Sequence, residues 1–537
     1  MENFRKLGLS ESSVETLRSL GFEEPTEIQE KTIPVLLQTN KDVIAQAQTG
    51  TGKTAVFGLT FIEKLDCKAN RIQAIVLTPT RELAIQVAEE INKLKGKSGL
   101  KVVAIYGGQS IYLQLKQLKS GADVIVGTPG RVLDHLRQKT IKIDQVKYAV
   151  LDEADEMLNM GFIDDIDEIL SKTGDNRQLL LFSATMPDKI VSLSKKYMKD
   201  SVRIEAKKTQ LTTNLVDQIY FEVRQQDKFD ALARIIDIEN EFYGIIFCRT
   251  KIEADQIAVQ LKMRGYNAEA LHGDIVQKQR ETILNSFKAR KTSILVSTDV
   301  AARGIDVNNL SHVINFSLPQ DPESYVHRIG RTGRAGNEGT AITFITPDEY
   351  RRLLFFKKIT NTNIRRESVP DAEEVISIKK DRLASEIKRI ITEESLETYE
   401  EIAEAVAGEF DKTKIIAALL KNFMADELDI KKYTDIKRIE QKSIKVDAGS
   451  GSHTRLFITV GRRDNMSPKQ LVTYIEKNTG VDGRDINGVE IFDQFSFVSV
   501  SFENAELILS RFKDKMKGRS IVVERASEGP KKRRKKY

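Results

Sequence analysis

Short, largely apolar runs recur along the chain and are separated by stretches with helical spacing. Tyr148–Leu151, Gly244–Cys248, Ile294–Ser297 and His312–Phe316 are four such runs. A strand that is apolar along its whole length is typical of a parallel sheet covered by helices on both faces. The pattern therefore predicts an α/β fold with parallel sheets and flanking helices, in which ligands bind at the carboxyl ends of the strands.

From about residue 370 the pattern changes to amphipathic helical spacing. Apolar residues recur three or four positions apart at Leu383, Ile387, Ile390, Ile402, Val406, Phe410, Ile416, Leu419, Leu420 and Phe423. Thr398 and Glu401 have the spacing of a capping box, which predicts a helix start at Thr398. Residues 370–446 are therefore expected to form short helices, which pack either within the chain or against a second copy of it.

A glycine- and serine-rich linker, Asp447–Ser452, precedes a last folded unit at residues 453–526. Ser467, Pro468 and Gln470 mark a helix start and Gly480 its end, and a second helix carries Leu507, Ile508 and Phe512. Strand-like runs lie at Leu456–Gly461, Gly488–Ile491, Phe495–Val500 and Ile521–Val523. The order βαββαβ predicts a small α+β domain of the RRM-like, ferredoxin-like kind.

The composition excludes several classes of protein. With 537 residues and 40 % hydrophobic residues, the chain can form three or four domains with real cores. No apolar run could cross a bilayer and the amino terminus lacks a signal segment, so we expect a cytoplasmic protein with no membrane partner. Cys67 and Cys248 are far apart in apolar surroundings, which predicts two buried thiols in a reducing compartment, without a disulfide or metal role.

The positive charge is concentrated at the carboxyl terminus. The formal net charge is +6, and Lys531–Lys536 alone supplies six positive side chains, so the rest of the chain is neutral. The tail at residues 528–537 either binds nucleic acid through bulk electrostatics or only solubilises the chain.

A glycine-rich segment, Ala47-Gln-Thr-Gly-Thr-Gly-Lys-Thr54, has the pattern of a phosphate-binding loop. Its glycines allow backbone N–H groups to approach an anion, and the helix that follows favours negative charge at its start. Lys53 is expected to bridge the β and γ phosphates of ATP, and Thr54 to hold Mg²⁺. The loop residues expected to contact the nucleotide are Ala47, Gln48, Thr49, Gly50, Thr51, Gly52, Lys53 and Thr54.

An acidic run, Asp152-Glu-Ala-Asp155, directly follows the predicted strand Tyr148–Leu151. Its position at the carboxyl end of a parallel strand places Asp152 where it can face the metal. Glu153 can then orient and deprotonate a water that attacks the γ phosphate, which is the arrangement that phosphoryl transfer requires. The alternative for this run alone is a solvated acidic helix start.

These residues and those around them resemble the DEAD-box RNA helicases, from Phe4 to about residue 365. Phe22, Thr26 and Gln29 resemble the adenine-reading segment of the family, with Phe4 at the place of its upstream aromatic residue. The resemblance implies two tandem RecA-like domains, at 1–206 and 210–365. It also implies RNA contacts by Arg81, Gly108, Thr128 and Arg131, and coupling of hydrolysis to strand separation by Asp155, Ser183, Thr185 and His327.

The second half of the resemblance supplies arginines in place of a phosphate-binding loop. In Tyr325-Val-His-Arg-Ile-Gly-Arg-Thr-Gly-Arg334, the resemblance implies that Arg331 and Arg334 are arginine fingers that reach the γ phosphate. It also implies that Asp306 meets the ribose and that Thr298 contacts RNA, together with Arg303, Gln277 and Arg280.

The carboxyl-terminal part is similar to bacterial cold-shock helicases of the DeaD type. This similarity implies a dimerisation region at 370–446 and an RNA-binding domain at 453–526. Phe457, Phe495 and Phe497 are candidate stacking residues, but the run Asp493–Val500 departs from the usual RNA-contact consensus, so Arg462, Arg463 and Arg484 could bind RNA by charge instead. Core packing is the alternative for each phenylalanine.

Together these features predict an ATP-dependent RNA helicase that uses ATP and Mg²⁺ and opens short duplexes locally. The resemblance implies structured or ribosomal RNA as substrate, ribosomal precursors or RNA-decay proteins as partners, a homodimer, and a role in low-temperature growth. Two alternatives remain. A non-catalytic RNA chaperone would act without nucleotide, and a DNA-directed helicase would share the ATP site but would not require the 2′-OH.

Overall fold

The structure is a computed structural model of the chain. It describes residues 1–537 apart from 48–50, 207–215, 303, 304, 306, 308, 309, 334–337, 408, 409, 425, 426, 437–453, 465, 513, 514, 517, 518 and 527–537.

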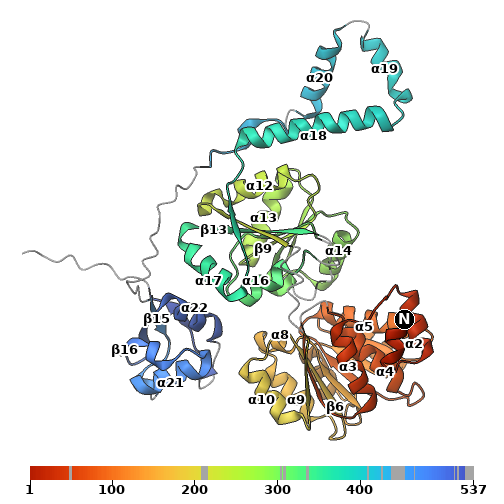
Figure 1. The fold of residues 1–537 in the computed structure, drawn as a ribbon, viewed down its shortest axis with the longest axis vertical. Helices are drawn as coiled ribbons and strands as arrows, with labels where there is room; N and C mark the ends of the chain where they lie inside the picture. The colour runs from red at the N-terminus through yellow and green to blue at the C-terminus, as the bar shows by residue number, and fades with distance from the viewer. Residues whose placement is uncertain are drawn as a thin grey trace, which may run out of the picture. The chain divides into compact units, whose positions relative to one another are not determined.

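The first lobe, residues 1–206, is built on a sheet of seven strands (Figure 1). The strands are β1 (Val43–Gln46), β2 (Ala74–Leu77), β3 (Val102–Ile105), β4 (Val124–Gly127), β5 (Tyr148–Leu151), β6 (Gln178–Ser183) and β7 (Val202–Glu205). Their order is β3-β4-β2-β5-β6-β1-β7, and all neighbouring pairs are parallel. The predicted strand Tyr148–Leu151 is confirmed as β5.

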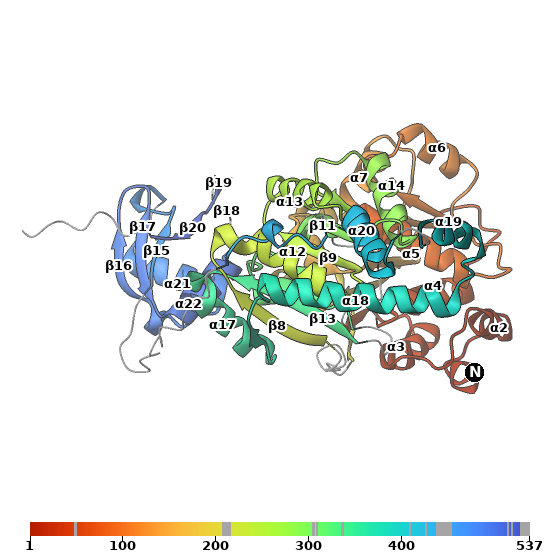
Figure 2. The same cartoon turned by 90° about the horizontal axis from the view of Figure 1, so that it is seen from above.

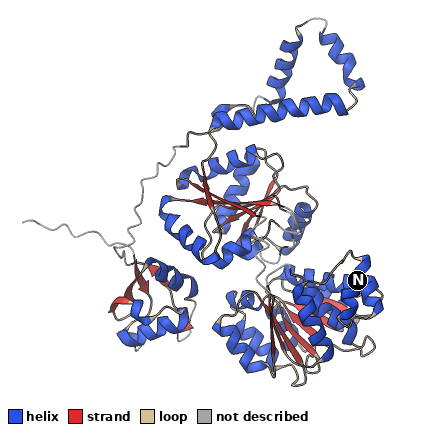
Figure 3. Ribbon diagram, viewed as in Figure 1, coloured by secondary structure: helices blue, strands red, loops and turns tan. Residues whose placement is uncertain are grey.

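Helices cover both faces of this sheet, as Figure 3 shows. They are α1 (Glu2–Lys6), α2 (Glu11–Ser19), α3 (Glu27–Gln38), α4 (Lys53–Lys64), α5 (Arg81–Leu94), α6 (Ile111–Lys119), α7 (Pro129–Arg137), α8 (Ala154–Asn159), α9 (Ile163–Ser171) and α10 (Asp188–Tyr197). Alternate residues of each strand belong to two separate cores. In β5, Tyr148 and Val150 pack with α1 to α5, whereas Ala149 and Leu151 pack with α7 to α10. Two covered faces explain why the strands are apolar throughout.

The strand order divides the carboxyl edge of the first sheet into two halves. Because β5, β6 and β1 are neighbours, the loops after Leu151, Ser183 and Gln46 leave the sheet side by side. The loops after β2, β3 and β4 form the other half. The nucleotide segments predicted from the sequence fall in the first half, and the segments predicted to contact RNA fall in the second.

The second lobe, residues 216–367, repeats this plan with another sheet of seven strands, in the order β10-β11-β9-β12-β13-β8-β14. The strands are β8 (Val216–Glu222), β9 (Gly244–Cys248), β10 (Ala268–Leu271), β11 (Ile294–Thr298), β12 (His312–Asn315), β13 (Gly339–Ile345) and β14 (Arg365–Glu367). The helices are η1 (Gln225–Asp227), α12 (Lys228–Ile238), α13 (Lys251–Met263), α14 (Gln277–Lys288), α15 (Asp299–Ala302), α16 (Pro322–Ile329), η2 (Pro347–Glu349) and α17 (Tyr350–Thr360). The predicted α/β fold with two RecA-like sheets is confirmed.

A helical region follows and consists of α18 (Ala372–Glu393), α19 (Glu397–Ala407), α20 (Lys412–Met424) and η3 (Ile430–Lys432) (Figure 1). The predicted helix start at Thr398 is wrong, because α19 begins at Glu397 and the Leu396 carbonyl accepts from Tyr399 and Glu400. Thr398 therefore lies within the first turn and does not cap it.

The last domain, residues 454–526, has a four-stranded antiparallel sheet in the order β16-β17-β15-β20 (Figure 2). Its elements are β15 (Thr454–Ile458), η4 (Arg462–Asp464), α21 (Pro468–Thr479), η5 (Gly483–Asp485), β16 (Asn487–Ile491), β17 (Ser496–Val500), α22 (Phe502–Arg511), β18 (Lys515–Met516), β19 (Arg519–Ser520) and β20 (Val523–Arg525). Ser467 and Gln470 form the predicted capping box, and Gly480 ends the helix in the left-handed conformation at φ 74°. The last strand lies two residues beyond the predicted start, after the short pair β18 and β19.

One prediction about the cysteines is also wrong. Cys248 is buried in β9, but Cys67 is exposed, because it follows α4 in a turn at the surface. Neither cysteine forms a disulfide in the structure. Among the residues that the structure describes, no helix is long and apolar enough to span a membrane.

Candidate functional site

The phosphate-binding loop connects β1 to α4. Gly52 has a left-handed backbone at φ 82°, and a Cβ atom there would lie 2.4 Å from Gln29 Nε2. The left-handed conformation favours glycine at this position, and a larger residue would also have to displace the Gln29 amide. Lys53 begins α4 with its side chain buried, and Thr54 follows it half-exposed. The predicted contacts of Gln48, Thr49 and Gly50 fall outside the described residues.

The predicted adenine-reading segment is attached to this loop. Thr26 Oγ1 donates a 2.8 Å hydrogen bond to the Thr51 carbonyl, and Gln29 Nε2 donates at 3.1 Å to the Gly52 carbonyl. Gln29 Oε1 accepts from the Thr26 amide at 3.0 Å, which completes the capping box of α3. Gln29 is almost fully buried, so in this structure its amide connects the segment to the loop. The sequence did not indicate this second role of Gln29.

The two aromatic residues of this segment have different environments. Phe22 is half-buried, and its ring packs edge-on against Phe4 with 6.5 Å between centroids. Phe4 is completely buried in the core of the first lobe. Phe22 therefore retains an accessible surface for stacking, whereas Phe4 supports it from the core side.

The acidic run after β5 lies beside the phosphate-binding loop. Asp152 Oδ1 is 4.0 Å from Lys53 Nζ, and both side chains are buried. Burial raises the pKa of the Asp152 carboxyl, while the Lys53 ammonium and the Glu153 amide partly offset this effect. Glu153 has a left-handed backbone at φ 51°, which is uncommon for a residue other than glycine and often marks a functional position.

These residues fit a magnesium ion. Desolvation destabilises the ionised form of Asp152, so a cation brought next to it would be favoured. Mg²⁺ in nucleotide sites is held by one or two carboxylates together with phosphate oxygens, and it does not need a cluster of protein ligands. The described residues contain no group of three or more His, Cys, Asp or Glu that could hold a metal. Asp152 and the Thr54 hydroxyl provide oxygen donors of the appropriate kind.

The predicted coupling segment is bonded directly to the acidic run. Asp155 Oδ2 accepts hydrogen bonds from the amides of Ala184 and Thr185, at 3.1 and 2.8 Å, and from Thr185 Oγ1 at 3.0 Å. Ser183 Oγ donates to the Thr185 carbonyl at 2.6 Å, and the Ser183 carbonyl accepts from the Ala47 amide at 3.1 Å. The structure therefore connects the phosphate-binding loop, the segment Ser183–Thr185 and the acidic run.

The residues predicted to contact RNA lie at the other half of the sheet edge. Arg81 begins α5, and its guanidinium lies so close to Gly108 that a Cβ there would be 2.4 Å from Nη1. Gly108 has φ 87°. Arg131 Nε and Nη2 donate to the carbonyls of Tyr106 and Gln109, at 3.1 and 2.8 Å.

Thr128 precedes α7 at the N-cap position without a side-chain capping bond, and Pro129 occupies the first turn. Four predicted residues, Arg81, Gly108, Thr128 and Arg131, are thus brought together around the loop that follows β3.

A buried network that the sequence did not indicate supports this group. His135 Nε2 lies 3.0 Å from Gln114 Oε1, and Gln114 Nε2 donates to the Tyr106 carbonyl at 2.8 Å. His135 Nδ1 lies 2.7 Å from Thr140 Oγ1. His135 and Gln114 are both fully buried and connect α7 to α6. No local pattern in the sequence indicates this contact, because β4 separates α6 from α7 along the chain.

In the second lobe, Thr298 ends β11 half-exposed, and α15 begins directly after it. Arg280 Nη2 donates to the Ala301 carbonyl at 2.6 Å, which fixes α15 to α14. Arg280 is buried, so its role in this structure is to position the segment after Thr298. The predicted contacts of Arg303, Asp306 and Arg334 lie outside the described residues.

His327 lies in the last turn of α16, and Arg331 follows this helix. The intervening residue Arg328 is buried, and its Nη1 donates to Asn315 Oδ1 at 3.0 Å and to the Ser317 carbonyl at 2.8 Å. Tyr325 is completely buried and donates to Gln218 Oε1 at 3.0 Å, and burial raises its pKa. Arg328 and Tyr325 therefore anchor α16, the helix that contains His327 and precedes Arg331.

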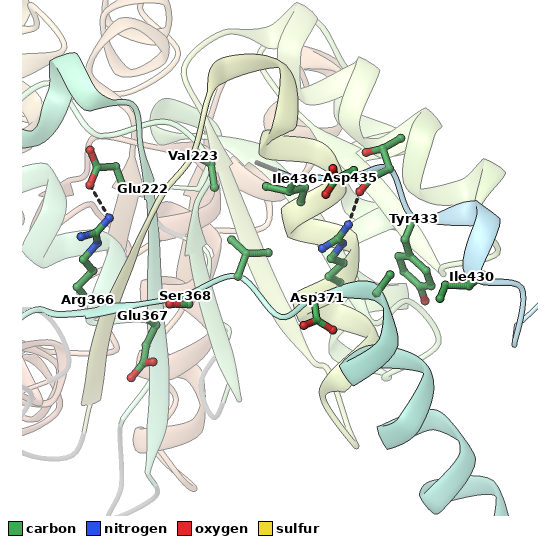
Figure 4. A pocket seen from close by; sticks show the side chains of 14 residues that line it. Glu222, Val223, Arg366, Glu367, Ser368, Asp371, Ile430, Tyr433, Asp435 and Ile436 are labelled. Carbon is green, nitrogen blue, oxygen red and sulfur yellow. Dashed lines mark hydrogen bonds and ion pairs between the residues drawn. The ribbon is translucent and has the colours of Figure 1, made fainter. Parts of the chain in front are cut away.

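A separate cavity of about 480 Å³ lies where the second lobe meets α18 (Figure 4). Arg234 of α12 donates at 2.8 Å to the Pro370 carbonyl and also to the Thr434 carbonyl. Tyr433 Oη donates to Asp237 Oδ2 at 2.6 Å, and Lys379 Nζ lies 2.9 Å from Asp237 Oδ1. These contacts hold α18 and residues 430–436 on α12 of the second lobe.

Comparisons with family models divide the chain into four matched segments. A model described as DEAD/DEAH box helicase matches residues 26–193, and one described as helicase conserved C-terminal domain matches 227–336. The RNA helicase DeaD dimerization domain matches 370–432, and the DbpA RNA binding domain matches 455–525.

The chain is also similar to named relatives and to solved structures. The chain is 46 % identical over 451 residues to the ATP-dependent RNA helicase CshA of Listeria monocytogenes, covering 84 % of this chain and 86 % of the relative. It is 44 % identical to CshA of Geobacillus kaustophilus, covering 85 % and 98 %. Among solved structures it is similar to S. cerevisiae Dbp5 bound to RNA and ADP BeF3, with 33 % identity and a TM-score of 0.63, covering 70 % and 98 %. Mss116p bound to ssRNA and AMP-PNP gives 28 % identity and a TM-score of 0.61, covering 71 % and 84 %.

Proposed function

The chain belongs to the DEAD-box family of ATP-dependent RNA helicases, and we propose that the acidic run after β5 carries out its ATP hydrolysis. The enzyme is an RNA-dependent ATPase that unwinds RNA. We base the catalytic roles assigned below on the buried pair of Lys53 and Asp152 beside the phosphate-binding loop.

Each residue of the first lobe has a distinct part in this proposal. Lys53 contacts the β and γ phosphates. Phe22, Thr26 and Gln29 bind the adenine of ATP. Hydrogen bonds from Thr26 and Gln29 join this adenine-binding segment to the phosphate-binding loop. Glu153 orients the attacking water and accepts its proton. The unusual backbone of Glu153 supports this assignment, because it turns the chain sharply at the end of β5.

Mg²⁺ is the metal we propose, held by Asp152 and Thr54. When bound, it would neutralise charge on the phosphates. The protein residues account for the rest of the proposal: Lys53 binds the phosphates, and the buried Asp152 lies 4.0 Å from the Lys53 ammonium.

The second lobe provides the arginines. We assign Arg331 and Arg334 to the charge that develops on the γ phosphate, Asp306 to the ribose, and Thr298 to the RNA backbone. Guanidinium groups of this kind accelerate phosphoryl transfer strongly in other nucleotide hydrolases. Because the site is divided between two lobes, hydrolysis requires their closure, and an RNA that binds both lobes favours the closed state.

The RNA contacts are proposed to be made to the sugar-phosphate backbone. Arg81, Gly108, Thr128 and Arg131 offer guanidinium, hydroxyl and amide donors, which suit phosphate oxygens and carry little sequence information. The setting we propose is ribosome assembly and RNA turnover, with structured RNA as the substrate.

A panel of nucleic acids tests this function. The full chain is given ATP with single-stranded RNA, a short RNA duplex, or DNA of equal sequence. We expect ATP turnover to rise with RNA and to remain near its basal rate with DNA, because the 2′-OH distinguishes the two. Equal stimulation by DNA would favour a DNA-directed helicase, and duplex annealing without nucleotide turnover would favour a chaperone.

We also propose that the chain forms a homodimer through α19 and α20. Ile402, Ile416, Leu419 and Phe423 are each more than half exposed on these helices. Apolar surface of this extent on short helices is typical of an interaction site. The match to a dimerization domain at 370–432 supports a second copy as the partner.

Light scattering at micromolar concentration tests the dimer. We expect twice the chain mass of 60.7 kDa, and half of that for the variant Leu419→Glu with Phe423→Glu. The control variant Tyr112→Glu replaces an exposed aromatic residue of α6, outside the helical region, and should stay dimeric. A monomeric wild-type chain would contradict the proposal.

A further inference from the structure

Glu63, in the last turn of α4, accepts three hydrogen bonds at a single oxygen. The donors to Oε1 are the Ser10 amide at 3.0 Å, the Ser10 hydroxyl at 2.8 Å and the Ser13 hydroxyl at 2.6 Å. Ser10 is the N-cap of α2, and Ser13 lies in the first turn of that helix. The Glu63 carboxylate therefore holds the amino-terminal end of α2 against the carboxyl-terminal end of α4.

The position of Glu63 is unfavourable within its own helix. The carboxyl-terminal end of a helix carries partial negative charge, which repels a carboxylate in the last turn of α4. The same carboxylate is favourable for α2, because it faces the positive, amino-terminal end of that helix. This asymmetry indicates that the function of Glu63 concerns α2 and not the stability of α4.

The opposite end of α2 fixes the backbone of Phe22. Gly21 has a left-handed conformation at φ 80°, and its amide donates to the Arg18 carbonyl at 3.1 Å. The Phe22 amide donates to the Leu17 carbonyl at 3.0 Å. These two bonds form a Schellman motif, in which the last turn of the helix fixes the residue two positions beyond the C-cap. A movement of α2 therefore also moves Phe22.

The first helix supports the same ring. Phe4 of α1 is completely buried and packs edge-on against Phe22, with 6.5 Å between ring centroids. Arg5 of α1 forms a two-pronged ion pair with Glu11 of α2, at 2.6 and 2.9 Å. This contact connects α1 to α2, so the position of α2 also influences the ring that supports Phe22.

We propose that Glu63 is a positioning residue for the adenine of ATP and acts through α2 on the ring of Phe22. This inference rests on the proposed function, in which Phe22 binds adenine and the loop before α4 binds the phosphates. The helix α4 then serves both ends of the nucleotide. Lys53 begins α4 at the phosphate side, and Glu63 at the other end of α4 holds the helix that orients the adenine-binding ring.

Glu63 affects the orientation of α2 and not its folding. Val14 and Leu17 are completely buried in the core of the first lobe, so apolar packing keeps α2 on the lobe when Glu63 is replaced. Loss of the three hydrogen bonds releases only the amino-terminal end of the helix. The resulting tilt changes the stacking of Phe22 on adenine, and an aromatic contact of this kind changes affinity about three- to tenfold.

The experiment measures RNA-stimulated ATP turnover of the full chain and its competitive inhibition by tripolyphosphate. Tripolyphosphate has the phosphates of ATP without ribose or adenine, so it reports on the phosphate-binding loop. For Glu63→Ala we expect the KM for ATP to rise about three- to tenfold. We expect kcat and the inhibition constant of tripolyphosphate to stay at their wild-type values. Equal weakening of ATP and tripolyphosphate would show that Glu63 only stabilises α4, and this result would overturn the proposal.

Conservative variants grade the effect. Glu63→Gln keeps an oxygen with two lone pairs, so its KM should lie between those of wild type and Glu63→Ala. Ser13→Ala removes one of the three donors and should raise KM by less than Glu63→Ala does.

Glu168→Gln is the matched control. Glu168 is a half-buried carboxylate of α9 that pairs with Arg137 and Lys172, and α9 packs in the other core of the same lobe. Its KM for ATP should equal that of wild type. A rise as large as that of Glu63→Ala would show that the effect is not specific to α2 and would overturn the proposal.

A double variant tests the route through Phe22. In a chain that already carries Phe22→Ala, Glu63→Ala should raise KM no further, because the ring on which Glu63 acts is gone. An equal rise with and without the Phe22 ring would overturn the proposal. Failure of the proposed function would look different, because Phe22→Ala alone would then leave the KM for ATP unchanged.

Discussion

Asp155 Oδ2 accepts hydrogen bonds from both the amide and the hydroxyl of Thr185, at 2.8 and 3.0 Å. Asp155 belongs to the acidic run after β5, and Thr185 to the segment after β6, so the contact joins two neighbouring strands at their carboxyl ends. Hydrogen bonds to an ionised carboxylate are stronger than those between neutral groups. We propose that a change at the nucleotide side of this contact is transmitted to the segment Ser183–Thr185.

Thr185→Val tests this coupling. Valine keeps the shape of threonine and removes the hydroxyl that donates to Asp155, while the amide contact remains. We expect RNA-stimulated ATP turnover within about threefold of wild type and at least a tenfold loss of duplex unwinding, because a hydrogen bond to a charged group contributes about 1.5–3 kcal/mol.

Thr173→Val is the control for Thr185→Val, since Thr173 donates only to the Leu170 carbonyl at the end of α9. It should retain both activities. Equal losses of turnover and unwinding in Thr185→Val would show that this contact serves hydrolysis itself and not its coupling.

Glu153→Gln should abolish ATP turnover while ATP binding survives. Glutamine keeps the size of the side chain but cannot accept the proton of the attacking water, and general-base catalysis contributes about 10²–10⁴ in rate. Phosphate release and the binding of a fluorescent ATP analogue measure the two properties separately. Retained turnover would refute the assignment of Glu153 as the base.

The sequence predicted the parallel α/β architecture well, because both faces of each sheet are covered and the strands are apolar throughout. Tyr148–Leu151 and Gly244–Cys248 are strands with the predicted ends. The helix start at Ser467 was also predictable, since the capping box and proline act locally. These features depend on residues that are close together in the chain.

Features that depend on distant residues could not be predicted. Gln29 was expected to face adenine, and nothing near it in the sequence indicates its bond to the Gly52 carbonyl. The contact of His135 with Gln114 joins two helices that are separated by a strand. Cys67 was expected to be buried because its neighbours in the sequence are apolar, but the turn after α4 exposes it.

Replacing both Arg331 and Arg334 with alanine should reduce RNA-stimulated phosphate release by about 10³ or more, because a guanidinium stabilises the charge that develops on the γ phosphate. The affinity for ATP should change little, since the first lobe binds the nucleotide. Arg290→Ala is the control, because Arg290 lies on the surface of the same lobe over the Tyr243 ring. Phosphate release that stays at the wild-type rate in the double variant would contradict a divided active site.

The stability of the first lobe should depend on the protonation of His135. Gln114 Nε2 donates to the Tyr106 carbonyl, so Gln114 Oε1 faces the imidazole ring. Because this amide oxygen can only accept a hydrogen bond, His135 Nε2 carries the proton. Burial lowers the pKa of His135 from 6.5, Arg131 lowers it further, and Asp134 opposes them.

The sign of the pH effect follows from this shift. In the unfolded chain the ring takes up a proton near pH 6.5, whereas in the folded lobe it does so only at lower pH. Between pH 6.5 and the lowered pKa of the folded lobe, the unfolded state therefore binds more protons than the folded state. The free energy of unfolding then decreases as the pH falls below about 6.5. We expect the melting temperature of wild type to fall more between pH 7.5 and pH 5.5 than that of His135→Gln, whose amide cannot titrate. An equal fall in melting temperature for the two proteins would show that His135 does not titrate on unfolding. RNA affinity measured between pH 7.5 and pH 5.5 would report whether the network also positions Arg131.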